Sequence, residues 1–172
     1  MKTYFVSSDI HSFYYLFIDE LNKNGFDENN KNHIIIICGD PFDRGPESEE
    51  LLEFLYHLQE QDRLILIRGN HEDLMRDCLR DMKRGYRIES HHISNRTVDT
   101  ISQLTHINKY DLLCGIYKYE EVEAKLNKYF DLISHSYNYY ELGDYIFVHG
   151  WIPYIESYED LKKANDIRWE AA

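Results

Sequence analysis

Short apolar runs alternate with segments of helical periodicity along the first half of the chain. The apolar runs are bounded by polar turn residues, and we predict that they form strands at 4–6, 34–37, 64–67 and 145–148. Apolar residues recur at helical spacing over 12–25 and 48–61, and a third helix is predicted over 72–84. This β-α-β-α-β order predicts an α/β fold whose parallel strands are joined by right-handed crossovers.

The middle of the chain is more polar, and helical spacing persists there only near 98–104 and 120–130. We interpret residues 73–132 as a helical insertion that caps the face carrying the strand ends, so that residues 1–172 form a single domain. After the insertion, residues 134–141 alternate as a strand does. A Leu-Gly-Asp turn then leads back into the last apolar run, which predicts a β-hairpin.

Composition narrows the class of protein further. The chain has 172 residues and a formal net charge of −12, which disfavours a nucleic-acid partner. No apolar stretch is long enough to span a membrane, and no apolar leader precedes the first strand, so we expect a cytoplasmic protein without a membrane partner. The three cysteines are an odd number without metal-site spacing, and they are predicted to be reduced thiols.

The second predicted strand ends in the loop Gly39-Asp40-Pro41-Phe42-Asp43-Arg44-Gly45. A glycine permits a sharp turn, and the proline stiffens the loop because its φ is fixed. Two carboxylates and a guanidinium are thereby concentrated at the carboxyl end of a strand, which is where open α/β sheets bind ligands. A polar turn with a surface salt bridge is the alternative interpretation of this loop alone.

The other predicted strands also end at residues that can bind a metal ion. Asp9 and His11 follow the first strand, Gly69-Asn70-His71-Glu72 follows the third, and His149-Gly150 follows the fourth. In this order the motifs resemble the calcineurin-like metallophosphoesterases, and specifically the phosphoprotein (serine/threonine) phosphatase family. That family's pattern is D-x-H, G-D-x-x-D-R-G, G-N-H-E and then H-G or H-A. The resemblance implies an αββα-type sandwich with a central mixed sheet, flanking helices and a helical cap.

The resemblance also implies two divalent metal ions as cofactors. The family's ligand sets, carried over to this sequence, are Asp9, His11 and Asp40 for one ion and Asp40, Asn70 and His149 for the other. A shared carboxylate suits two ions roughly 3.5–4 Å apart, which clamp the attacking and leaving oxygens of a phosphate ester. Mixed oxygen and nitrogen ligands favour Mn, Fe or Zn over Ca. Taken singly, Asn70 could form only a turn, and His149 could be an ordinary packed histidine.

The same resemblance assigns the remaining roles. It makes His71 the general acid, oriented by Asp43, and a carboxylate partner does raise an imidazole's pKa and fix its tautomer. Arg44 offers a planar guanidinium that can bind two phosphoryl oxygens, although a salt bridge to Asp40 or Asp43 is the alternative. The further substrate-binding candidates are Asn70 and Arg168.

The chain departs from the family pattern near its end. Family members continue after H-G through a tryptophan-containing segment to a further G-H motif, whose histidine completes the second ion's ligand set. Here Asp166–Ala172 resembles the tryptophan-containing segment, and no Gly-His follows Gly150. The resemblance therefore implies that the C-terminal part of the family domain is missing. On that basis we expect weak binding of the second ion and self-association through an incomplete sheet.

Three functions remain open from the sequence. The motifs most resemble a metal-dependent phosphoesterase that hydrolyses phosphate monoesters of serine/threonine phosphoproteins, with a water activated by two metal ions and His71 as general acid. One alternative is hydrolysis of dinucleoside polyphosphates such as diadenosine tetraphosphate. The other is a domain that binds metal or phosphate with little turnover. The expected partner is accordingly a phosphorylated protein or a small phosphoester substrate.

Overall fold

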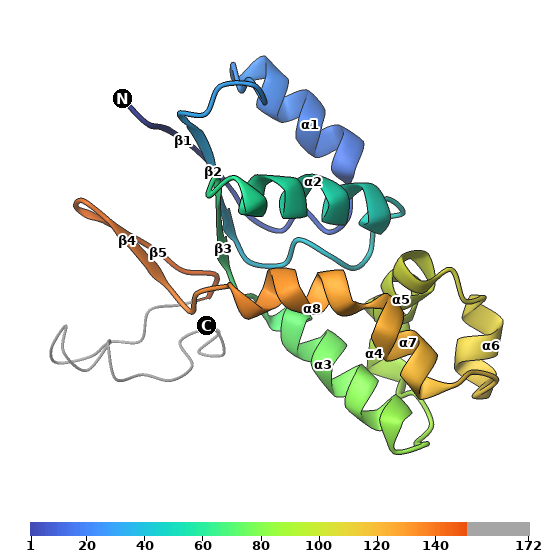
Figure 1. Cartoon of the computed structure of the whole chain (residues 1–172). Helices are drawn as coiled ribbons and strands as arrows, with labels where there is room; N and C mark the ends of the chain where they lie inside the picture. Colours follow the sequence, from blue (N-terminus) through green and yellow to red (C-terminus); the bar gives the residue numbers. More distant parts are fainter. Residues whose placement is uncertain (151–172) are drawn as a thin grey trace, which may run out of the picture.

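Three parallel strands lie at the centre of the fold in the computed structural model, which describes residues 1–150 of the chain (Figure 1). They are β1 (Thr3–Ser7), β2 (His33–Cys38) and β3 (Leu64–Ile67), in the order β1-β2-β3. Phe5 pairs with Ile35, which in turn pairs with Leu64. The predicted strands and their parallel arrangement are confirmed.

The helices α1 (Tyr14–Lys23) and α2 (Ser48–Glu60) connect these strands, and α3 (Asn70–Lys83) begins directly after β3. Ile35 and Ile37 of β2 belong to the same core as the apolar face of α2. All four isoleucines of β2, Ile34–Ile37, are at most 4% exposed. A central parallel strand is covered on both faces, which is why its sequence is a continuous apolar run.

Five further helices fill most of the region that the sequence marks as an insertion. They are α4 (Ser90–Ser94), α5 (Thr97–Thr105), α6 (Lys109–Cys114), α7 (Tyr119–Lys125) and α8 (Asn127–Ser134). Of these, α5 is the central one, because it packs against α2, α3, α4, α6 and α7. Its apolar side chains Val98, Ile101 and Leu104 are buried in the core. The helical content of this region is therefore higher than its weak periodicity predicts.

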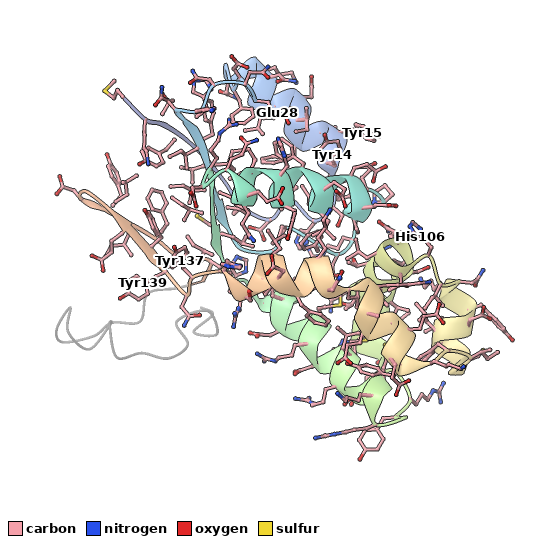
Figure 2. All side chains as sticks on the ribbon, in the orientation of Figure 1. Tyr14, Tyr15, Glu28, His106, Tyr137 and Tyr139 are labelled. Carbon is pink, nitrogen blue, oxygen red and sulfur yellow. The ribbon has the colours of Figure 1, made fainter. Side chains whose placement is uncertain are left out.

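A β-hairpin of β4 (Tyr140–Leu142) and β5 (Tyr145–Phe147) follows α8, as predicted. The predicted start of its first strand is wrong, because residue 134 still belongs to α8, whose buried face continues through Leu132. Tyr137 instead forms a single parallel bridge to Ile67 beside the sheet (Figure 2). The hairpin lies on the other side of the sheet from α1 and α2 (Figure 1).

The structure confirms the predicted α/β class, with a parallel sheet and flanking helices. Within residues 1–150 the antiparallel pair forms a second sheet, and β1 is an edge strand of the first. No helix in this part of the chain is both long and apolar enough to cross a membrane. The predicted substrate ligand Arg168 and the tryptophan-containing segment lie outside the described residues. The three cysteines are unpaired, as predicted.

Candidate metal centre

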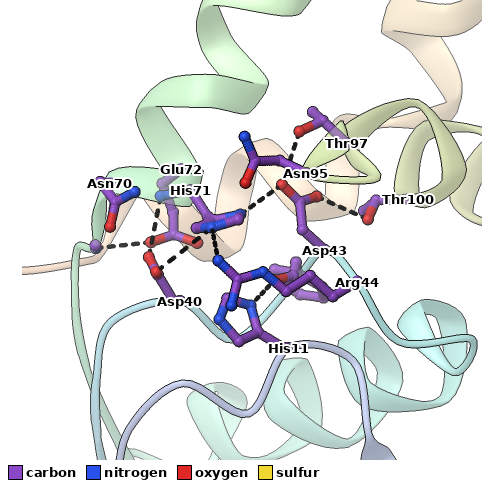
Figure 3. A network of polar contacts seen from close by, with 12 residues as sticks. His11, Asp40, Asp43, Arg44, Asn70, His71, Glu72, Asn95, Thr97 and Thr100 are labelled. Atoms are coloured by element: carbon purple, nitrogen blue, oxygen red, sulfur yellow. Dashed lines mark hydrogen bonds and ion pairs between the residues drawn. The ribbon is translucent and has the colours of Figure 1, made fainter. Parts of the chain in front are cut away.

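The predicted site residues meet at the carboxyl edge of the parallel sheet, and Figure 3 shows His11, Asp40, Asn70 and His71 among them. Asp9 and His11 lie in the loop after β1, and Asp40 lies in the loop after β2. Asn70 and His71 open α3 after β3, while His149 follows β5. Carboxyl ends of parallel strands share one edge of a sheet, so residues far apart in sequence become neighbours here.

Backbone hydrogen bonds join the loop after β1 to the loop after β2. The N–H of Asp9 donates to the carbonyl of Gly39 at 3.1 Å, and the N–H of His11 donates to the carbonyl of Asp40 at 3.1 Å. The N–H of Gly45 donates back to the carbonyl of His11 at 2.7 Å. These bonds extend the β1–β2 pairing beyond the strands and fix the two loops relative to each other.

The same loops contain an unusual concentration of left-handed backbone. The φ angle is 51° at Asp9, 50° at His11, 52° at Asp40, 71° at Asp43 and 63° at Arg44. Such angles are unfavourable for residues with a side chain, and they persist only where surrounding contacts impose them. The fold therefore maintains strained backbone at the residues for which the motifs predict chemistry.

Two glycines of the motifs are required by close packing. A Cβ atom at Gly39 would collide with the ring of His149, and one at Gly69 would collide with the carboxylate of Asp40. In addition, φ is 83° at Gly39, a conformation that side chains disfavour. These glycines let the backbone approach the site residues directly.

Asp40 is the common member of two groups of possible metal ligands. One group is Asp9, Asp40 and His149, and the other is His11, Asp40 and His71; the ligand atoms within each lie within 4.8 Å of one another. Nε2 of His149 also lies 3.0 Å from Oδ1 of Asn70. The carboxylate of Asp40 is only 3% exposed, and it accepts a hydrogen bond of 3.0 Å from the N–H of His71.

Three imidazoles surround Asp40, and each is anchored through Nδ1. In His11, Nδ1 donates to the carbonyl of Phe42 at 3.0 Å, and in His149 it donates to the carbonyl of Cys38 at 2.8 Å. In His71 it donates to the carboxylate of Asp43. Carbonyl and carboxylate oxygens only accept, so Nδ1 carries the proton and Nε2 faces the centre. This is the orientation that metal-ligating histidines adopt.

The charges around Asp40 depend on its partners. Burial would raise the pKa of Asp40, but hydrogen bonds from His149 and from the N–H of His71 hold that pKa below its usual value. Burial would likewise lower the pKa of His149, but pairing with Asp40 raises it to about 9. For His11, burial outweighs the hydrogen bond to Phe42 and lowers the pKa. The imidazole of His11 is thus neutral at neutral pH, as a metal ligand must be.

His71 and Asp43 form a buried pair next to these ligands. Nδ1 of His71 lies 2.8 Å from Oδ2 of Asp43, and the two side chains are at most 2% exposed. Burial would lower the pKa of His71, but the hydrogen bond to Asp43 and the charge of Asp40 raise it above its usual value. The guanidinium of Arg44 lies 3.2 Å from Nε2 of His71, so its contact is with the imidazole.

Two further residues of the site were missed by the sequence interpretation. The hydroxyls of Thr97 and Thr100 both donate to the carboxylate of Asp43 at 2.8 Å (Figure 3). They lie on α5, more than 50 residues along the chain, and threonine at helical spacing is a weak signal because it occurs on many helices. The predicted site residues within residues 1–150 all lie in this one neighbourhood.

Glu72 completes the start of α3 and has a structural role. Its carboxylate accepts a hydrogen bond of 2.7 Å from the N–H of Gly69, as in a capping box. The side chain is 4% exposed, and burial together with the charge of Asp40 raises its pKa to about 7. The arrangement orients the first turn of α3, which carries Asn70 and His71.

Comparison with known proteins places this geometry in a family. The chain is 43% identical over 72 residues to a symmetrical bis(5'-nucleosyl)-tetraphosphatase of Buchnera aphidicola, a match that spans 42% of this chain and 24% of that protein. A cold-active protein-tyrosine phosphatase of Shewanella is 22% identical, with a TM-score of 0.50 over 95% of this chain and 47% of that one. A mutant cold-active protein tyrosine phosphatase gives 21% identity and a TM-score of 0.51, over 97% and 48% of the two chains.

The two structural likenesses show a shared fold, and this chain spans about half the length of those solved structures. The calcineurin-like phosphoesterase family matches residues 2–172, which is almost the whole chain. Together with the motif order, this match confirms the resemblance found in the sequence. The chain belongs to the calcineurin-like phosphoesterase family.

Proposed function

We propose that this chain is a metal-dependent phosphoesterase acting on small phosphoesters, with dinucleoside polyphosphates as its preferred class of substrate. The observation that carries the proposal is the buried carboxylate of Asp40, which is common to two groups of possible metal ligands, one with Asp9 and His149 and one with His11 and His71. The imidazole of His71 is also paired with the buried carboxylate of Asp43. A carboxylate between two ligand groups suits a pair of divalent ions. The substrate class is supported by the curated relatives, whose name denotes tetraphosphatases.

The donor atoms fit divalent ions such as Mn, Fe or Zn. We assign Asp9, His11 and Asp40 to one ion, and Asp40, Asn70 and His149 to the other. The anchored Nδ1 atoms of His11 and His149 direct Nε2 toward the centre as the ligand atom, and mixed oxygen and nitrogen ligands suit these metals. When bound, the two ions supply Lewis-acid polarisation of the phosphoryl group.

The groups of the chain itself perform the remaining steps. His71 is the proposed general acid, because its Nε2 faces the centre while Asp43 holds Nδ1. Arg44 lies next to this nitrogen, where its guanidinium can bind two phosphoryl oxygens of the substrate. Asn70 is proposed to contact substrate as well as metal. Arg168 remains a predicted substrate ligand outside the described residues.

Hydrolysis of phosphoserine and phosphothreonine proteins is the second candidate. The sequence G-D-x-x-D-R-G followed by G-N-H-E, at residues 39–45 and 69–72, favours it because that pattern resembles the phosphoprotein phosphatases. The same ligand groups and the same proton donor would serve either substrate. The two candidates therefore differ in what binds around the centre and not in the centre itself.

The test compares three substrates with the Mn-loaded chain: diadenosine tetraphosphate, a phosphothreonine peptide and 4-nitrophenyl phosphate. We expect Mn-dependent hydrolysis of diadenosine tetraphosphate with a higher kcat/KM than for the peptide. Asp40→Asn serves as the inactive control. A higher kcat/KM for the peptide would overturn the substrate class, and bound Mn without hydrolysis of any substrate would support a binding domain instead of an enzyme.

A further inference from the structure

The polar face of α5 contacts the loop that contains Asp43 and Arg44. Its contacts come from Arg96, which precedes the helix, and from Thr97, Thr100 and Gln103. The last three are spaced three residues apart, so they lie along one side of the helix. The buried residues Val98 and Ile101 of the same helix belong to the apolar core. The three-residue spacing thus orients three hydrogen-bonding side chains toward this loop.

Two of these contacts reach the carboxylate of Asp43 itself. The hydroxyl of Thr97 donates to Oδ2 and the hydroxyl of Thr100 donates to Oδ1, each at 2.8 Å. Both threonines are 0% exposed and Asp43 is 1% exposed. A buried carboxylate needs donors to offset its lost hydration, and here each oxygen receives one from α5.

The two bonds also determine how Asp43 meets His71. Because each carboxylate oxygen is held by a different hydroxyl, the carboxyl group cannot rotate without losing a buried hydrogen bond. Oδ2 accepts simultaneously from Thr97 and from Nδ1 of His71, which is 2.8 Å away. The imidazole is thereby fixed with Nε2 toward Asp40 and Arg44.

We propose that Thr97 and Thr100 are positioning residues of the reaction: they hold Asp43 so that Nε2 of His71 is directed at the leaving oxygen of the substrate. This inference rests on the proposed function. In the step concerned, the oxygen of water bonds to phosphorus and one of the water protons leaves to solvent, while the bond to the leaving oxygen breaks and its electron pair moves to that oxygen. Nε2 gives its proton to the same oxygen, and the neutral ring later regains a proton from solvent.

The proposal assigns a task to the helical region that covers the face carrying the strand ends. Residues 97–105 form a helix packed against five others, so the positions of the two hydroxyls are set by the core. Gln103 adds hydrogen bonds of 2.9 Å from the N–H of Ser48 and 3.2 Å to the carbonyl of Gly45. The loop that contains Asp43 is thus held by α5 as well as by its own sheet.

The variants Thr97→Val and Thr100→Val, alone and together, remove the hydroxyls while keeping the side-chain shape. Thr105→Val is the matched control, because Thr105 is equally buried on the same helix but its hydroxyl donates to the carbonyl of Ile101 at 2.6 Å. Thr97→Ser and Thr100→Ser restore a hydroxyl. Thermal unfolding selects the variants that fold, and the single variants replace the double variant if it does not.

The kinetic measurement is kcat for phenyl phosphate and for 4-nitrophenyl phosphate. We expect the double valine variant to lose about 10–100-fold with phenyl phosphate, the loss typical when a partner that orients a site residue is removed. The loss with 4-nitrophenyl phosphate should be far smaller, because its leaving oxygen needs little protonation. The serine variants should recover both rates, and Thr105→Val should keep them. Equal losses with both substrates, or none, would overturn the proposal.

A second measurement does not depend on activity. In the metal-free protein, ¹⁵N NMR of the His71 ring, assigned with His71→Asn, reports the Nδ1 proton and its hydrogen bond to Asp43. We expect that proton's resonance to shift or to be lost by exchange in the double valine variant and to stay unchanged in Thr105→Val. An unchanged resonance in the double variant would overturn the positioning role. A wild type without phosphoesterase activity would contradict the proposed function, and the ring resonance would then decide on the positioning of His71.

Discussion

The loops that follow β1, β2 and β3 contribute to the site differently from helix α5. The loops present Asp9, His11 and Asp40 at the sheet edge, where their polar atoms converge and the backbone adopts strained φ angles. Helix α5 presents no predicted ligand. Its buried hydroxyls, on Thr97 and Thr100, instead donate hydrogen bonds to the carboxylate of Asp43.

This difference separates two physical tasks. A metal ligand must have a free donor atom near the ions, so it is found at a strand end and within a short motif. A residue that orients another side chain needs only a buried hydrogen bond, and it can come from anywhere in the fold. We therefore expect substitutions in the loops to change metal binding, and substitutions that affect His71 and its partners to change proton transfer.

The largest effect is expected at Asp40, where the two ligand groups meet. Asp40→Ala should abolish loading with Mn and lower kcat by at least about 10³-fold, because Lewis-acid stabilisation contributes several kcal/mol. Elemental analysis of the loaded protein checks this, with Asp19→Ala, a substitution on the exposed face of α1, as control. Metal content equal to that of the wild type would refute the assignment of Asp40 as shared ligand.

A smaller loss is expected at His71, which lies between the two tasks. Removing a general acid typically costs about 10²–10⁴-fold in rate, so His71→Asn should lose that much in kcat. It should also retain Mn, since we assign no metal to its imidazole. However, His71 lies within 4.8 Å of the ligand atoms of His11 and Asp40. If the variant loses Mn as Asp40→Ala does, His71 is a ligand and the separation of tasks fails.

The sequence predicted the sheet and the convergence of the candidate ligands well because both depend on local patterns. Four consecutive β-branched residues between turn residues favour a strand covered on both faces, as observed for Ile34–Ile37. The glycines before Asp40 and Asn70 are needed because a side chain there would collide with the site. The site residues at the strand ends were accordingly predicted at the positions where the structure brings them together.

The helical region was predicted less well because its determinants are not local. The helices α4 and α6 have only 5 and 6 residues, too few for periodicity to be recognised. The start of the hairpin was misplaced because Ile133 and the residues after it alternate as a strand would, while packing extends α8. Thr97 and Thr100 could not be assigned because their partner Asp43 lies more than 50 residues away, and hydroxyl groups on a helix do not indicate what they bind.

Glu72 provides a test that concerns stability in place of rate. Its pKa is raised from 4.5 to about 7 in the folded chain, so the folded state binds the proton more tightly than the unfolded state does. The resulting stabilisation is fully present below pH 4.5 and is lost as pH rises through about 7. The loss amounts to about 3 kcal/mol.

Glu72→Gln should remove this dependence, because an amide oxygen can still accept from the N–H of Gly69 but does not titrate. Urea unfolding of the metal-free proteins between pH 4.5 and 8 measures the difference in the free energy of unfolding. That difference should grow with pH in favour of the variant. Parallel curves for the two proteins would show that burial does not perturb Glu72.

The smallest effect is expected at Arg44, which is in the loop after β2 but is exposed and is assigned neither to a metal nor to proton transfer. Arg44→Gln should raise KM by about 10-fold, since a hydrogen bond to a charged group contributes about 1.5 kcal/mol. Mn content should stay at the wild-type level. The KM of Arg44→Lys should lie between those of the wild type and Arg44→Gln, because an ammonium keeps the charge but not the planar pair of donors.

The control is Arg80→Gln, on the exposed face of α3 and paired with Asp77. A loss in kcat at unchanged KM would instead place Arg44 with His71, which it contacts at 3.2 Å, and would move one loop residue to the proton-transfer side of the comparison.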